Sequence, residues 1–135
     1  MKRFSTATWN GPGLTGHGLL ASESKEINAN SFTFDSRFKH GSGTNPEELL
    51  AAAYASDFAM KLSFVLGEAG FVPEDLEITC YIALENGAIT SAHITVMAGN
   101  AEIPTIIWDE SLRETEKNTP VGKTLNIPVS IERLP

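Results

Sequence analysis

The first third of the chain alternates between apolar and polar residues in three short runs. Residues 2–9 alternate well enough to form a strand, and the Asn-Gly-Pro-Gly cluster at 10–13 is typical of a turn. Residues 17–27 form a second extended run. A third run, 31–38, has one face that carries the side chains of Phe32, Phe34, Ser36 and Phe38. The pattern predicts a meander of three strands, followed by a flexible connection at 39–43.

A long helix is predicted from Asn45 to Gly70, and both of its ends are marked. Asn45 is a good N-cap, Pro46 suits the first helical position, and Glu48 can reach back to the cap. Gly70 supplies the stop. Between these signals apolar residues occur on nearly every side, so we expect a core helix that is buried around most of its circumference.

The pattern returns to period two after the helix. Residues 76–84 and 88–97 flank Glu85-Asn86-Gly87, a strong hairpin signal. Residues 105–117 predict an amphipathic helix, whose apolar face carries Ile107 or Trp108, Ser111, Leu112 and Thr115. A short helix begins at Thr119, with Pro120 at its first position, and 127–134 forms a last strand whose Pro128 suggests a sheet edge.

These elements predict an α+β fold in a single domain over residues 1–135, with a second antiparallel sheet following the long helix. A helix this long and apolar is difficult to cover with the sheets of one small chain. We therefore expect a homodimer in which the long helices are buried against each other.

Composition narrows the possible partners. The net charge is −7 and the pI is near 4.9 without a cluster of basic residues, which argues against a nucleic-acid partner. The longest apolar run, 49–55, is too short to span a bilayer, and the N-terminus lacks a hydrophobic signal core, so we expect a cytoplasmic protein without a membrane partner. The three histidines, His17, His40 and His93, lack ligand spacing, and we predict no metal and no cofactor.

Two residues draw attention for their chemistry. Cys80 is the one cysteine, so no disulfide can form within a chain, and its strand-like surroundings favour an inert apolar filler over a reactive thiolate. Asp57 lies within the apolar helix, where a carboxylate must be paired, protonated or in a pocket. Alternatively, Asp57 lies on a narrow solvent-exposed stripe and pairs with Lys61 four residues later.

Several motifs together resemble one known family. They are Phe34-Asp-Ser-Arg-Phe38, the block from Gly43 to Ala53 with its Thr-Asn-Pro-Glu-Glu-Leu core, Asp57-Phe-Ala-Met60, Leu66-Gly-Glu-Ala-Gly-Phe71 and Thr119-Pro-Val121. The chain resembles the osmotically inducible protein C and organic hydroperoxide resistance (OsmC/Ohr) family over nearly its whole length. The resemblance implies an OsmC-like fold and an intertwined homodimer. It also implies an enzyme that reduces organic hydroperoxides with two cysteines, typically with dihydrolipoyl thiols as reductant.

This chain departs from the family at both cysteines. By resemblance, Arg37 and Glu47 match the arginine and glutamate that activate the peroxidatic thiolate. Asp57 takes the place of the peroxidatic cysteine, and Thr119 that of the resolving cysteine. Peroxide reduction needs a thiolate that becomes a sulfenic acid, and neither a carboxylate nor an alcohol can undergo that oxidation. We therefore predict that the family's peroxidase reaction is absent.

Helix geometry indicates where the matched residues meet. Glu47 and Asp57 are ten residues apart, hence about 15 Å along one helix and roughly 80° around it. If both serve one site, Glu47 and Arg37 reach it from the other subunit, and Arg37 then pairs with Asp57.

Three interpretations of such a site follow. It is a pocket at the dimer interface for a small apolar or anionic ligand, or a purely structural buried ion pair. Otherwise, Asp57 serves a different enzyme as general base or nucleophile, tuned by Arg37 and Glu47.

Overall fold

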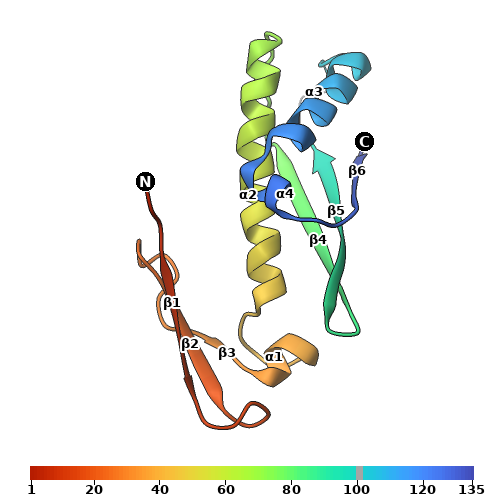
Figure 1. Cartoon of the computed structure of the whole chain (residues 1–135). Coiled ribbons are helices and arrows are strands. Elements are labelled where there is room, and N and C mark those ends of the chain that lie inside the picture. Colours follow the sequence, from red (N-terminus) through yellow and green to blue (C-terminus); the bar gives the residue numbers. More distant parts are fainter. Residues whose placement is uncertain (100–101) are drawn as a thin grey trace. The chain divides into compact units, whose positions relative to one another are not determined.

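The computed structural model describes residues 1–99 and 102–135. The chain forms two compact units, Met1–Leu49 and Leu50–Pro135, which are described separately (Figure 1). The prediction of a single domain over 1–135 stays a prediction. The elements are β1 (Ser5–Asn10), β2 (His17–Ser22), β3 (Asn30–Phe32), α1 (Phe34–Phe38), α2 (Pro46–Glu68), β4 (Glu77–Glu85), β5 (Ala88–Met97), α3 (Thr105–Asn118), α4 (Pro120–Thr124) and β6 (Val129–Arg133).

The first unit contains the predicted meander. Strands β1, β2 and β3 form an antiparallel sheet in that order, although β2 ends at Ser22, earlier than the extended run suggested. The prediction that 31–38 is one strand is wrong, because α1 begins at Phe34. Thr33 Oγ1 accepts a hydrogen bond from Ser36 N (3.0 Å), and Ser36 Oγ accepts one from Thr33 N (2.8 Å). This reciprocal capping box starts a helix in spite of the alternating pattern.

The ends of α2 follow the predicted signals. Asn45 Oδ1 accepts a hydrogen bond from Glu48 N (2.8 Å), which confirms the cap. Glu48 does not reach back to the cap, since its carboxylate accepts a bond from Thr44 Oγ1 (2.9 Å). Gly70 has φ +89°, a left-handed conformation that glycine adopts without strain.

Burial along α2 differs from the prediction. Within one chain the buried apolar residues of the helix form a single stripe at four-residue spacing, which consists of Tyr54, Phe58, Leu62 and Leu66. Met60 and Phe64 are 67% and 66% exposed. The expected burial around most of the circumference is therefore not met by one chain. By length and composition α2 could also cross a membrane, but core helices share these properties and one such helix is weak evidence.

The second unit packs α2 and α3 against a three-stranded sheet. Its core joins the buried stripe of α2 with Ile94 and Val96 of β5 and with Trp108 and Leu112 of α3. The predicted apolar face of α3 is confirmed, with Trp108 rather than Ile107 fully buried. In the hairpin between β4 and β5, Asn86 and Gly87 both have positive φ, as the Asn-Gly pair indicated.

The last strand corrects the predicted topology. The strand order is β4-β5-β6, and β6 pairs with β5 in parallel, so the second sheet is mixed rather than antiparallel. The path from β5 to β6 runs through α3 and α4, and a helical crossover of this kind connects parallel neighbours. The prediction that β6 lies at the sheet edge is confirmed.

Candidate functional site

Asp57 is held by the start of α4. Its Oδ2 accepts a hydrogen bond from the backbone N–H of Val121 (2.8 Å), at the second position of that helix. Thr119 occupies the N-cap position, but its side chain makes no capping bond. The carboxylate of Asp57 thus satisfies an amide that Thr119 leaves free, and a negative charge is favourable at this end of a helix. No ion pair joins Asp57 to Lys61 in the described part of the chain.

Two buried hydroxyl groups meet beside this contact. Thr119 is fully buried, and its Oγ1 has no hydrogen-bond partner among the described residues. A Cβ atom added at Gly122 would lie 2.5 Å from Thr119 Oγ1 and 2.8 Å from the Tyr54 hydroxyl oxygen. Both hydroxyls therefore crowd the same backbone position, which only glycine fits without movement of its neighbours.

Burial changes the ionisation of two groups in the second unit. It raises the pKa of the Tyr54 phenol above its ordinary value. The nearby Thr119 hydroxyl opposes this rise, although the two groups do not meet hydrogen-bond geometry. Burial also raises the pKa of the Cys80 thiol, which lies half-buried in β4 and packs against the core. At neutral pH this thiol is protonated, the form that does not attack peroxides.

Arg37 and Glu47 form a bidentate pair within the first unit. Arg37 Nη2 donates to Glu47 Oε1 (2.7 Å), and Arg37 Nε lies 3.1 and 3.2 Å from the two carboxylate oxygens. The Glu47 side chain is only 10% exposed, whereas that of Arg37 is 39% exposed. Hydrogen bonding to Arg37 lowers the pKa of Glu47, and the bond to Glu47 raises the pKa of Arg37.

Arg37 also borders a small aromatic cup, defined here as the cavity of about 170 Å³ lined by Trp9, Gly13, Phe32, Thr33, Phe34, Arg37, Phe38 and Pro46. The rings of Trp9 and Phe32 are 5.6 Å apart. The guanidinium carbon of Arg37 lies 5.0 Å from the centre of the Phe38 ring. Such a cup suits an apolar group, and its one charged wall is largely neutralised by Glu47.

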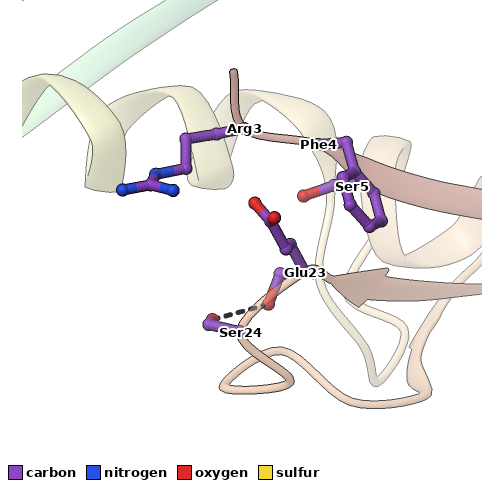
Figure 2. A pocket seen from close by; sticks show the side chains of 6 residues that line it. Arg3, Phe4, Ser5, Glu23 and Ser24 are labelled. Atoms are coloured by element: carbon purple, nitrogen blue, oxygen red, sulfur yellow. Dashed lines mark hydrogen bonds between the residues drawn. The ribbon is translucent and has the colours of Figure 1, made fainter. Parts of the chain in front are cut away.

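A polar cleft of about 580 Å³ lies elsewhere in the first unit, where the segments flanking β1 and β2 meet (Figure 2). Figure 2 shows Arg3 and Glu23 at this cleft, and Ser22 Oγ lies 3.2 Å from Ser24 Oγ. None of the described residues that line it is a buried polar side chain, and we assign it no function. Among residues 1–99 and 102–135, no group of three His, Cys, Asp or Glu side chains could bind a metal ion.

The structure therefore brings the predicted residues together in two pairs. Asp57 and Thr119 meet at the start of α4, and Arg37 meets Glu47. The predicted Arg37–Asp57 pair stays a prediction. The sequence did not predict the Val121 amide or the Tyr54 hydroxyl as part of the site, because a backbone donor leaves no signal in residue types and Tyr54 resembles any other apolar helix residue.

Comparison with known proteins connects this arrangement to one family. The model of the OsmC-like protein family matches residues 39–132. Peroxiredoxin OsmC of Escherichia coli is 32% identical over 130 residues, which cover 93% of this chain and 91% of that protein. The structure of the organic hydroperoxide resistance protein OhrB of Bacillus subtilis aligns with a TM-score of 0.75 at 22% identity, covering 97% of this chain and 98% of that one. An organic hydroperoxide resistance protein OsmC from Legionella pneumophila aligns with a TM-score of 0.71 at 17% identity, covering 96% of both chains.

Proposed function

The chain belongs to the OsmC-like protein family, and from this premise we propose that it is a member without thiol peroxidase activity. In this proposal Asp57 stands in place of the peroxidatic cysteine and Thr119 in place of the resolving cysteine. The protein keeps a pocket at the interface of a homodimer, which binds a small apolar or anionic ligand or stabilises the dimer. In this proposal the protein acts in the cytoplasm.

The observation that carries the proposal is the bond between Asp57 and the Val121 amide. At the position matched to the family's reactive sulfur, the side chain is an oxygen acid engaged with the backbone of α4. The chain has one cysteine, Cys80. Its thiol lies half-buried in β4, and burial raises its pKa. The bond to Val121 gives the Asp57 carboxylate a structural partner on α4, so we prefer the non-peroxidatic function over the alternative enzyme.

Two surfaces support the dimeric pocket. The exposed apolar face of α2, which includes Met60 and Phe64, needs a cover that a second copy would provide. The aromatic cup beside Arg37 supplies an apolar cavity. In the proposed dimer the Arg37–Glu47 pair of one subunit approaches Asp57 of the other.

A peroxidase assay tests the proposal. Purified protein is mixed with cumene hydroperoxide and dihydrolipoamide, and peroxide consumption is followed against a blank without protein. Peroxiredoxin OsmC of Escherichia coli serves as the active relative. We expect no consumption above the blank, because no side chain at 57 or 119 can form a sulfenic acid.

Clear turnover by the wild-type chain that is lost in Asp57→Ala or in Cys80→Ser would overturn the proposal. The complementary variant carries Asp57→Cys and Thr119→Cys together. We expect it to consume peroxide, whereas Asp57→Cys alone lacks the protein's own resolving thiol, depends on dihydrolipoamide to reduce its sulfenic acid, and is therefore slower.

A further inference from the structure

The outer face of the second sheet carries a serine, a histidine and a glutamate in contact. His93 lies in β5 between Ala92 and Ile94, whose side chains are buried in the core, so its own side chain is on the opposite face. The register pairs His93 with Ser130 of β6 and with Tyr81 of β4. Glu132, two residues after Ser130, shares this face.

The contacts place the histidine between the serine and the glutamate. His93 Nδ1 lies 2.6 Å from Ser130 Oγ, and His93 Nε2 lies 3.4 Å from Glu132 Oε2. In the tautomer with hydrogen on Nε2, that hydrogen faces the carboxylate, which can only accept a hydrogen bond. In this tautomer Nδ1 presents its lone pair to the hydroxyl and Ser130 donates the hydrogen bond, whereas the other tautomer reverses that bond. Nucleophile, base and acid follow in the order of a serine triad for acyl transfer, with the two ring nitrogens exchanged relative to that triad.

We propose that Ser130, His93 and Glu132 form an acyl-transfer site, separate from the pocket of the proposed function. Ser130 Oγ attacks the carbonyl carbon of an activated ester while its proton passes to His93 Nδ1. A new Ser130 Oγ–acyl carbon bond forms, the bond from the acyl carbon to the leaving oxygen breaks, and His93 returns the proton to that oxygen. Water then attacks the acyl-serine with His93 as base, which releases the acid and restores Ser130. Glu132 stabilises the transient imidazolium.

The surroundings indicate the class of substrate. The side chains of His93 and Glu132 are 40% and 58% exposed, so an acyl donor can reach them from solvent. Tyr81 is 57% exposed, and its ring lies 6.1 Å from the imidazole at an interplanar angle of 33°. An aromatic leaving group can rest on this ring. The open face encloses no acyl chain, and the substrates are therefore small aryl esters with good leaving groups.

The test uses p-nitrophenyl acetate with the full-length protein. Release of p-nitrophenolate is followed in time, and peptide mapping by mass spectrometry locates the acetyl group. We expect acetylation of Ser130 and ester hydrolysis that falls at least tenfold in Ser130→Ala and in His93→Gln, since a positioned general base contributes about 10²–10⁴-fold. In Glu132→Gln the rate of ester hydrolysis should fall less than in the other two variants. Circular dichroism confirms that each variant is folded.

The matched control is Ser91→Ala, which removes a serine from the same strand two residues before His93 and should leave the rate unchanged. Retention of full activity in Ser130→Ala with loss in His93→Gln would overturn the proposal, because the imidazole itself would be the nucleophile. Acetylation that is no greater at Ser130 than at Ser91 would also overturn it.

Discussion

Asp57 illustrates how far a single residue can be interpreted from sequence. Its position among apolar helix residues marked it as a carboxylate in need of a partner, and the structure supplies one. Residue types suggested Arg37 or Lys61 as partners. The observed donor is the backbone N–H of Val121, which any residue except proline provides, so no pattern of side chains could identify it.

The Arg37–Glu47 pair permits a prediction at the residue scale. Arg37→Ala leaves the nearly buried carboxylate of Glu47 without its donor, and we expect a loss of about 1–3 kcal/mol in the free energy of unfolding at pH 7. Arg37 lowers the folded-state pKa of Glu47, so the pair stabilises the protein above the unfolded pKa of glutamate, about 4.3. The stabilisation is lost as the pH falls through the lower folded pKa. Urea unfolding between pH 3 and pH 7 measures this.

Lys39→Ala is the control for this pair, because Lys39 and Asp35 are both well exposed and their pair should contribute little. An Arg37→Ala deficit that stays constant down to pH 3 would show that the lost packing of the arginine, rather than its charge, is responsible.

At the scale of elements, the residues that mark the ends of helices and the turns between strands predicted the structure best. Asn45 and Gly70 defined α2, and Asn86-Gly87 defined the hairpin, because each acts through local geometry. Two predictions failed for different reasons. The alternating aromatics of 34–38 concealed a capping box formed by two small hydroxyl side chains. The direction of β6 depends on the path of the chain through α3 and α4, which a strand's own residues do not encode.

Two glycines in helices differ in the space around them, so substituting each by alanine gives two stability changes to compare. Gly122→Ala in α4 places a methyl group against Thr119 Oγ1 and the Tyr54 hydroxyl, and we expect a loss of about 1–3 kcal/mol. Gly67→Ala in α2 meets nothing within 4 Å and should gain about 0.5–1 kcal/mol from helix propensity. Chemical denaturation of both variants measures the difference. Equal effects would mean that the α4 contacts relax freely.

At the scale of the whole molecule, the sequence predicted an α2 helix with apolar residues all around it, and one chain covers only one stripe. The same core carries Ile94, Val96 and Trp108, so the strands and α3 account for that stripe. Met60 and Phe64 remain exposed. The pattern of apolar residues in a sequence indicates which surfaces tend to be buried. It does not say whether the same chain or a second copy buries them.

The proposed homodimer predicts the effect of a charge on this face. Phe64→Asp should weaken self-association at least tenfold, because a desolvated carboxylate without a partner would lie in the interface. Ile106→Asp is the control, since Ile106 is 64% exposed on α3. Sedimentation equilibrium gives both dissociation constants. A wild-type chain that sediments as a monomer at all concentrations would contradict the homodimer.

The hydrogen bond between Asp57 and Val121 has a consequence for the order of folding. It joins residues 64 positions apart, and the hairpin and α3 lie between them. With five residues, α4 is too short to persist alone, so it forms only after this large loop has closed. We therefore expect the Val121 amide to gain protection from hydrogen exchange only after α4 has reached Asp57.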